Sequence, residues 1–305
     1  MSSASAKVIL FGEHAVVYNQ PAIAIPVSDL RAFAEVESVG GAFQIIARDL
    51  NNRIITFVGD EPLVQVVQLT LEALNVPTPD ISMVVRSDIP IASGLGSGAS
   101  ISTAIVRELL KHFDEQLPND AINEIVYEVE KMHHGTPSGI DNTVIVYERA
   151  IYFVRNQPIE PIQIHTPLRL IIADTGKTAL TKDSVGDVRR LYENDKDRIV
   201  PVLEKIGRIT VDARNALETG AVEKLGQLMT VNHKLLQQLT VSSPELDKLV
   251  DSAVHAGALG AKLSGGGRGG NMIALVDEAT EALISEALLD AGAVRLFKTT
   301  LEQTN

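Results

Sequence analysis

The chain of 305 residues contains no cysteine. A disulfide framework, a thiolate metal site and a cysteine nucleophile are therefore excluded, and a reducing compartment is compatible with this composition. Basic residues are the minority charge: 27 lysines and arginines stand against 39 aspartates and glutamates, a net charge of −12. No basic run occurs, which argues against a nucleic-acid surface. An anionic nucleotide can still bind, since its site needs only local donors, a cation and a lysine.

Long apolar runs are also missing. No stretch approaches the 18 or more apolar residues of a membrane span, and the opening residues, with the single basic Lys7, do not predict a signal peptide. We therefore expect a cytoplasmic protein without membrane contact. The hydrophobic fraction of 45% and charged fraction of 22% are ordinary for a globular enzyme. A chain of this length can bury a large core in one or two domains.

Two carboxylates flank a tight turn in the middle of the chain. Residues 119–131 have helical periodicity, and the helix is expected to end before Gly135 and Pro137. Glu130 would lie near that helix end, and Asp141 at the start of a β-prone run over 144–147. Such a pair suits the binding of a divalent cation and the acceptance of a proton. The alternative is a helix-capping loop with solvated acids.

A glycine-rich loop over residues 88–100 leads into a helical pattern that continues past Ile101. Glycines let the backbone approach an anion, and the unpaired N–H groups of a helix start form a phosphate site. The loop is not a Walker A motif, because Gly98 is followed by Ala99 and Ser100, and its glycine spacing does not match a dinucleotide fingerprint. A lone loop of this kind is more often a turn than a ligand site.

Two further segments are unusual. Residues 8–11 predict a buried strand flanked by Lys7, Glu13 and His14, whose polar groups need partners because unpaired buried charges are unfavourable. Near the other end, five glycines occupy residues 265–270, interrupted only by Arg268. So many glycines would be an entropic burden in a plain connector, which favours a functional loop.

The remaining pattern alternates strands and helices. Strands are expected at 7–11, 22–27, 32–38, 43–48, 53–58, 81–86, 143–147, 150–154, 168–173 and 272–276, and helices near 61–75, 98–114, 119–132, 183–237, 244–256 and 278–290. Residues 156–167 form a connector with little periodicity, so a domain boundary is expected near 160–167. No internal repeat or low-complexity segment is evident.

In order and spacing, the four segments together resemble the GHMP small-molecule kinases. The segments around Lys7 and around Asp141 resemble in particular the mevalonate kinase family, whereas the two glycine-rich loops belong to the wider superfamily. The resemblance implies an α+β, two-domain fold: a ribosomal-protein-S5-like domain over 1–165 and a ferredoxin-like α/β domain over 166–305, with the active site in the cleft between them. Relatives are often homodimers.

The activity that the resemblance implies is ATP-dependent phosphorylation of the primary hydroxyl of (R)-mevalonate, with ATP as co-substrate and Mg²⁺ as cofactor. Asp141 would be the general base, Lys7 would lower the pKa of the hydroxyl, and Glu130 and Ser97 would hold Mg²⁺. The implied ATP-binding residues are Ser93, Gly94, Leu95, Gly96, Ser97, Gly98, Ala99, Ser100, Gly265, Gly266 and Gly267. The implied substrate-binding residues are Glu13, His14, Ser138 and Thr181. Arg268 would add charge near the phosphates.

The chain departs from the family pattern at two places. Many relatives carry Ser-Ser where this chain has Ser97-Gly98, and many carry Pro-Gly where it has Ser5-Ala6. Thr178 competes with Thr181 as the threonine that supports the catalytic aspartate. Kinases of phosphomevalonate, homoserine or galactose share the ATP loops and remain alternatives, as does a non-catalytic ATP sensor on the same scaffold.

Overall fold

The computed structural model describes residues 1–59, 61–90, 93–134, 138–177 and 181–304, apart from the side chains of residues 133, 134, 181 and 182. The chain forms two compact units. Unit 1 comprises residues 1–7, 30–91 and 95–148, and unit 2 comprises residues 8–29, 92–94 and 149–305. The units are interleaved in sequence, and the predicted division at residue 165 stays a prediction.

Unit 1 is a sheet covered by helices. Its strands are the first part of β1 (Ser2–Phe11), the second part of β2 (Ala22–Val39), β3 (Gln44–Ala47), β4 (Arg53–Thr56) and β5 (Ile81–Ser87). They follow the order β4-β3-β5-β2, with β1 also paired to β2; β3 and β5 run parallel, whereas β3–β4 and β2–β5 are antiparallel. A short 3₁₀ helix, η2 (Arg48–Leu50), joins β3 to β4.

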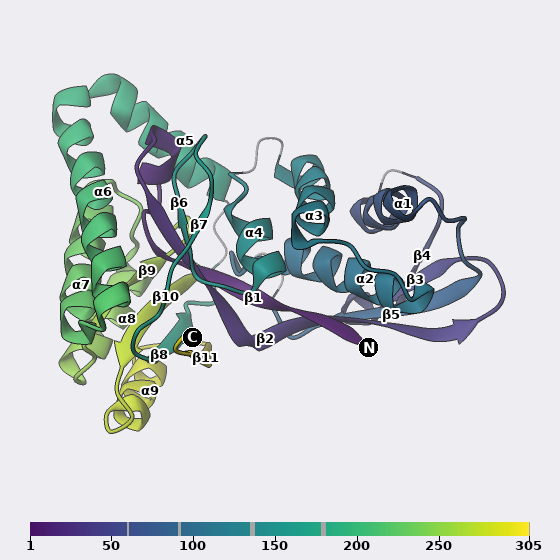
Figure 1. The fold of residues 1–305 in the computed structure, drawn as a ribbon. Coiled ribbons are helices and arrows are strands. Elements are labelled where there is room, and N and C mark those ends of the chain that lie inside the picture. The colour runs from purple at the N-terminus through teal and green to yellow at the C-terminus, as the bar shows by residue number, and fades with distance from the viewer. Residues whose placement is uncertain (60, 91–92, 135–137, 178–180, 305) are drawn as a thin grey trace. The chain divides into compact units, whose positions relative to one another are not determined.

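Four helices lie over this sheet (Figure 1): α1 (Pro62–Leu74), α2 (Ser97–Phe113), α3 (Asn119–His134) and α4 (Ile140–Tyr147). Each turns an apolar face toward the strands, as helical periodicity requires. Their shared core includes Ile45, Met83, Val67, Ile105 and Val126. Helices α2, α3 and α4 pack against one another, and this packing brings the ends of three chain segments together.

Unit 2 contains a four-stranded antiparallel sheet in the order β11-β8-β10-β9. The strands are β8 (Leu168–Asp174), β9 (Gly260–Ser264), β10 (Asn271–Val276) and β11 (Arg295–Leu301). The short strands β6 (Ile151–Phe153) and β7 (Glu160–Pro161) pair with each other, and β6 also pairs with the start of β2. The 3₁₀ helix η1 (Ala15–Tyr18) follows β1.

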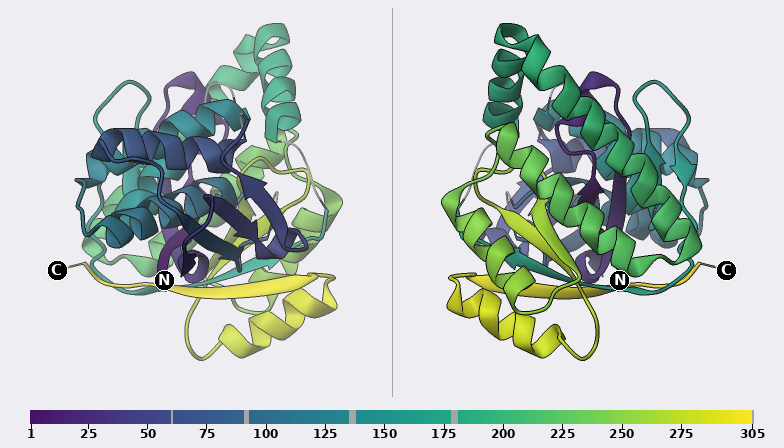
Figure 2. Two further views of the ribbon diagram at one scale, coloured as in Figure 1. Left: turned by 90° about the vertical axis from the view of Figure 1, so that its right-hand side faces the viewer. Right: turned by 90° about the vertical axis from the view of Figure 1, so that its left-hand side faces the viewer.

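The helices of unit 2 are α5 (Thr181–Asn194), α6 (Lys196–Thr219), α7 (Val222–Gln238), α8 (Pro244–His255) and α9 (Glu281–Asp290). The long helices α6 and α7 lie side by side, and α9 lies along the edge strand β11 (Figure 2). Helices α7 and α8 pack on β9. Their caps follow ordinary rules: Asp195 and Ser243 accept hydrogen bonds from the backbone N–H groups of Arg198 and Leu246 at the starts of α6 and α8.

The mixture of helices and sheets confirms the α+β class, and most predicted helices and strands are present. One prediction was wrong in a way that affects the site. Residues 143–147, expected as a strand, belong to helix α4. The run is rich in β-branched residues, but Val144, Ile145 and Val146 are all buried in the core of unit 1, and such packing overrides a weak local preference.

Other elements also differ from the expectation. The two strands predicted at 22–27 and 32–38 form one strand, β2, with a register shift between Val36 and Ser38 where it pairs with β5. The predicted helical stretch over 183–237 is divided into α5, α6 and α7. Strand β11 was not predicted, because its half-exposed residues lack a clear alternation.

Candidate active site

Lys7 and Asp141 form an ion pair in unit 1. The Nζ of Lys7 lies 2.8 Å from Oδ1 of Asp141. The lysine side chain is only 6% exposed and that of Asp141 is 36% exposed, so the carboxylate keeps a path to solvent while the ammonium does not. The backbone N–H of Lys7 also donates to the carbonyl of Leu95 at 3.0 Å. This contact ties strand β1 to the glycine-rich loop.

Asp141 lies in the first turn of α4, instead of preceding a strand as the sequence predicted. A carboxylate at this position is stabilised by the unpaired N–H groups and the positive end of the helix dipole. Ser138 precedes the helix, and its Oγ accepts a hydrogen bond of 3.4 Å from the N–H of Ile140. The exposed side chain of Ser138 is thus engaged, weakly, in starting α4. The helix start fixes where the Asp141 carboxylate lies.

Glu130 lies near the end of α3 and is buried, with 5% of its surface exposed. Burial, followed by the charge of Asp141, raises the pKa of Glu130 to about 7, and Lys7 opposes this rise. The ionised form of Glu130 is therefore unfavourable in this protein without an added cation. The structure brings Lys7, Glu130 and Asp141 into one electrostatic cluster, as the sequence predicted for them.

The phosphate-loop residues in unit 1 surround the start of α2. Ala99 and Leu95 are buried, and the hydroxyl of the buried Ser100 donates to carbonyls of Ser5 and Gly96. These side chains therefore serve packing, and the loop can offer a ligand its backbone N–H groups. An ideal Cβ on Gly98 would lie 3.1 Å from Oε1 of Glu130. The first turn of α2 and the Glu130 carboxylate are thus neighbours.

The oxygen donors near Glu130 fit a hard divalent cation. Mg²⁺ prefers oxygen ligands and commonly uses one or two carboxylates together with waters and phosphates. A buried carboxylate with a raised pKa also gains stability when a cation arrives. Within the described residues, no group of three or more His, Cys, Asp or Glu side chains forms a metal site.

Glu13 and His14, predicted to bind substrate, lie in unit 2. Glu13 forms a buried ion pair with Lys262 of β9, and Asn232 of α7 donates to its other oxygen at 3.4 Å. The Nε2 of His14 donates to the carbonyl of Gly266 at 3.0 Å. Burial is the main cause that lowers the pKa of His14 to about 4, so the ring is neutral near pH 7.

The second glycine-rich loop connects β9 to β10. Gly265 and Gly267 adopt positive φ angles of 84° and 76°, and the N–H of Arg268 donates to the carbonyl of Val241 at 2.8 Å. The Arg268 guanidinium, expected near the phosphates, forms an ion pair with Asp187 of α5. In this structure its charge is therefore neutralised by the protein.

Ser93 and Gly94, the remaining phosphate-loop residues, belong to unit 2. Asn271 at the start of β10 donates its Nδ2 to the carbonyl of Ser93 at 2.7 Å. The site residues predicted from the sequence do not include Asn271, Asn232 or Lys262, because their partners lie far away along the chain. The side chain of Thr181 and all of Thr178 lie outside the described residues.

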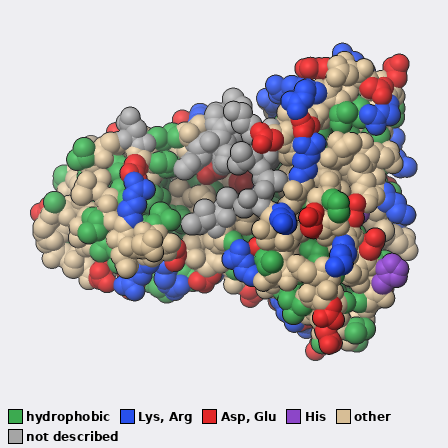
Figure 3. All heavy atoms as spheres, turned by 180° about the vertical axis from the view of Figure 1, so that it is seen from behind, with side chains coloured by type: hydrophobic (Ala, Val, Ile, Leu, Met, Phe, Trp, Pro, Cys, Tyr) green, Lys and Arg blue, Asp and Glu red, His purple; other side chains and the backbone are tan. Residues whose placement is uncertain are grey.

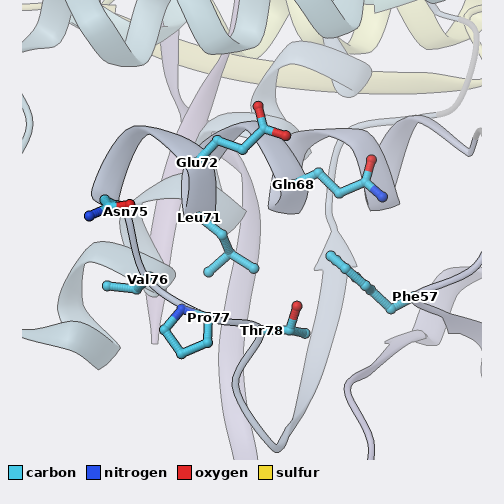
Figure 4. Close-up of a pocket in the computed structure, with 8 residues that line it drawn as sticks. All are labelled: Phe57, Gln68, Leu71, Glu72, Asn75, Val76, Pro77 and Thr78. Atoms are coloured by element: carbon cyan, nitrogen blue, oxygen red, sulfur yellow. The ribbon is translucent and has the colours of Figure 1, made fainter.

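A separate hollow in unit 1 has a volume of about 570 Å³. Figure 4 shows the residues around it, which come from β4–α1, from α1 itself and from the segment after α1. They are Phe57, Gln68, Leu71, Glu72, Asn75, Val76, Pro77 and Thr78. None of them is a predicted site residue.

The surface and the helices add two observations. On the face drawn in Figure 3, acidic and basic side chains are interspersed and do not gather by sign. Among the helices of the described ranges, none combines the length and apolar character needed to cross a bilayer.

Two comparisons with sequences give consistent results. Residues 62–149 match the family model of the GHMP kinases N terminal domain, and residues 213–294 match GHMP kinases C terminal. The mevalonate kinase of Pyrococcus abyssi is 35% identical over 298 residues, which cover 90% of this chain and 88% of the relative. The mevalonate kinase of Thermococcus sibiricus is 32% identical, covering 96% and 94% of the two chains.

Solved structures agree with the sequences. The L. major mevalonate kinase in complex with R-mevalonate has a TM-score of 0.85 and 30% identity, covering 99% of this chain and 96% of that chain. The Methanococcus jannaschii mevalonate kinase has the same TM-score at 28% identity, covering 99% and 98%. A Streptococcus pneumoniae phosphomevalonate kinase is 18% identical with a TM-score of 0.78, covering 97% and 98%, so that likeness concerns the fold alone.

Gly96→Ala should lower the free energy of unfolding by about 1–3 kcal/mol. Gly96 has φ +79°, and an added Cβ would lie 2.7 Å from Cδ1 of Ile145 and 3.1 Å from Cγ of Lys7. Urea unfolding measures the loss. Gly94→Ala is the matched control, because Gly94 also has a positive φ but no described atom lies within 4 Å of its added Cβ. Equal losses in the two variants would show that the contact with Lys7 and Ile145 is unimportant.

Glu130→Gln should stabilise the cation-free protein above pH 7 by about 1–3 kcal/mol. Because the pKa of Glu130 is raised to about 7, the folded protein holds a proton that the unfolded chain has released between about pH 4.5 and 7. Wild-type stability therefore falls as pH rises through this window, and the advantage of the variant should shrink toward pH 5. Urea unfolding with a chelator at pH 5 and 8 measures the difference. A pH-independent difference, or an equal one in the exposed control Glu128→Gln, would contradict the prediction.

Proposed function

Because this chain belongs to the mevalonate kinase family of the GHMP kinases, we propose that it transfers the γ-phosphoryl group of ATP to the primary hydroxyl of (R)-mevalonate. The observation that carries the proposal is the ion pair of Lys7 with Asp141, 2.8 Å long, beside the buried carboxylate of Glu130. The Asp141 carboxylate can accept a proton, and the Lys7 ammonium supplies positive charge beside the glycine-rich loop at the start of α2. Phosphoryl transfer to an alcohol requires this combination.

The reaction is written with Asp141 as the base. Asp141 accepts the proton of the primary hydroxyl, the hydroxyl oxygen forms a bond to the γ-phosphorus, and the bond from that phosphorus to the β–γ bridging oxygen breaks. ADP leaves, and 5-phosphomevalonate remains. Lys7, held against Asp141, stabilises the negative charge that develops on the oxygen and on the transferred group. The exposed fraction of Asp141, 36%, gives the substrate access to its carboxylate.

Other groups bind and orient the two substrates. The backbone N–H groups of residues 93–100 and 265–267 hold the phosphates of ATP, and His14 contacts mevalonate. Glu130 and Ser97 would hold Mg²⁺ together with the nucleotide, and the ion would supply positive charge that neutralises the phosphates. Ser138 and Thr181 remain predicted substrate contacts. From the family we further expect that the reaction takes place in a cleft between two domains and that the protein is a homodimer. From the composition we expect a cytoplasmic location.

Asp141→Asn should lower kcat by about 10²–10⁴-fold, the usual contribution of a positioned general base. Coupled measurement of ADP release gives the rate, and thermal unfolding checks that the variant is folded. Glu128→Gln, which removes an exposed carboxylate from α3, is the control and should retain the rate within about twofold. A folded Asn variant with near wild-type kcat would remove Asp141 from the mechanism.

The substrate is tested by offering mevalonate, phosphomevalonate, homoserine and galactose in parallel with Mg²⁺ and ATP. We expect turnover of about 1–100 s⁻¹ on mevalonate, a range typical of kinases, and none on the other three alcohols. Turnover on a different alcohol would retain the phosphoryl-transfer chemistry and reject the substrate. ATP binding with no turnover on any alcohol would favour the alternative function, a non-catalytic ATP sensor on the same scaffold.

A further inference from the structure

Lys262 is a fully buried charged residue of unit 2. It lies in β9 with 0% of its side chain exposed, and its Nζ forms an ion pair with Glu13, whose side chain is 1% exposed. The same Nζ donates to the carbonyl of Leu263 at 2.7 Å. The second carboxylate oxygen of Glu13 accepts from Nδ2 of Asn232 at 3.4 Å. Both oxygens of Glu13 are therefore turned toward protein donors.

A pair so deeply buried is not explained by stability alone. Removing two charges from water is unfavourable, and apolar residues of similar volume often serve stability equally well. Removing only one partner leaves an uncompensated buried charge, which strongly destabilises the surrounding structure. The pair is better explained by the geometry that it imposes on the segment carrying Glu13.

That segment is a tight turn over residues 12–14. Gly12 has φ +93°, and any Cβ there would lie 2.3 Å from the carbonyl oxygen of Pro21. His14 has φ +60°, which is uncommon for a residue with a side chain. Such conformations persist only where surrounding contacts hold them. Lys262 supplies one of these contacts at the centre of the turn, through Glu13.

Among the described residues, one polar atom of His14 in this turn has no hydrogen-bond partner. Because a carbonyl can only accept, the contact with Gly266 places the ring proton on Nε2, and Nδ1 carries a lone pair. Nδ1 is buried, and no described residue donates to it. A buried acceptor without a donor is unfavourable. A hydroxyl group of a ligand would satisfy it.

We propose that Lys262 is a positioning residue: its ion pair with Glu13 fixes the 12–14 turn so that Nδ1 of His14 accepts a hydrogen bond from a hydroxyl of the substrate. Glu13 contacts Lys262 and Asn232, and in this proposal it acts on substrate binding through the position of the turn. The direct substrate contact that the family resemblance implies for Glu13 is the alternative that the test below distinguishes. This inference rests on the proposed function, since the substrate is taken to be mevalonate.

Three variants test the proposal: Glu13→Gln, Lys262→Met and the double variant. Each is assayed for kcat and for the KM values of mevalonate and ATP, with thermal unfolding as a check of folding. Arg214→Met is the control. It removes an ion-paired arginine from α6 of the same unit and should leave both KM values unchanged even if stability falls.

Each single variant should raise the KM for mevalonate by about 10- to 100-fold, the order expected when a binding group is misplaced by about 1 Å. The KM for ATP should change by less than about threefold. The double variant should have a lower KM for mevalonate than Glu13→Gln alone, because it no longer contains an uncompensated buried ammonium. If Lys262→Met does not fold, the KM values for mevalonate of the double variant and of Glu13→Gln still test the proposal.

Two results would overturn the proposal. If Glu13 contacts the substrate directly, Glu13→Gln raises the KM, and adding Lys262→Met does not improve it. If the pair serves stability only, the variants unfold at lower temperature with unchanged KM values. A wild-type protein active on mevalonate separates either result from failure of the proposed function, and a wild-type protein inactive on every alcohol overturns both.

Discussion

The ion pair between Lys7 and Asp141 is the interaction on which the geometry of the candidate site depends. An ammonium that is almost fully buried requires a partner, and Asp141 provides it at 2.8 Å. Meeting this requirement brings the start of α4 to β1. The backbone of Lys7 simultaneously holds Leu95, so one residue sets the distance between the glycine-rich loop and the carboxylate.

Two buried carboxylates, Glu13 in unit 2 and Glu130 in unit 1, have different electrostatic surroundings. In unit 2, Glu13 and Lys262 compensate each other, and Asn232 completes the hydrogen bonding of the carboxylate. In unit 1, Glu130 is a buried carboxylate whose pKa is raised to about 7, because burial and Asp141 outweigh the attraction of Lys7. A compensated pair can fix geometry, whereas a buried carboxylate with a raised pKa gains stability when a cation binds. This contrast matches the roles that we propose for the two places.

Much of the fold follows from local pattern. Helix α2 was expected over 98–114 and spans Ser97–Phe113, and α3 was expected over 119–132 and spans Asn119–His134, because long amphipathic periodicity is a strong signal. The strand predicted for the short run over 144–147 was wrong. Val144 and Ile145 favour strands when only local preference is considered. In the structure the run is helical and its residues 144–146 are buried, and such packing overrides a weak local preference. Strand β11 was not predicted, because its partly exposed residues lack a clear alternation.

The sequence by itself determined the composition of the candidate site. Glu130 and Asp141 were singled out from the local pattern of a carboxylate on each side of a tight turn, and the resemblance to a kinase family joined Lys7 to them and implied their roles. Only the tertiary structure decided the pairings: Lys7 with Asp141, Glu130 in a buried position, and Glu13 with Lys262, 249 residues apart in the chain. The physical reason is that burial and the compensation of charge depend on which segments pack together, and that packing is a property of the whole fold.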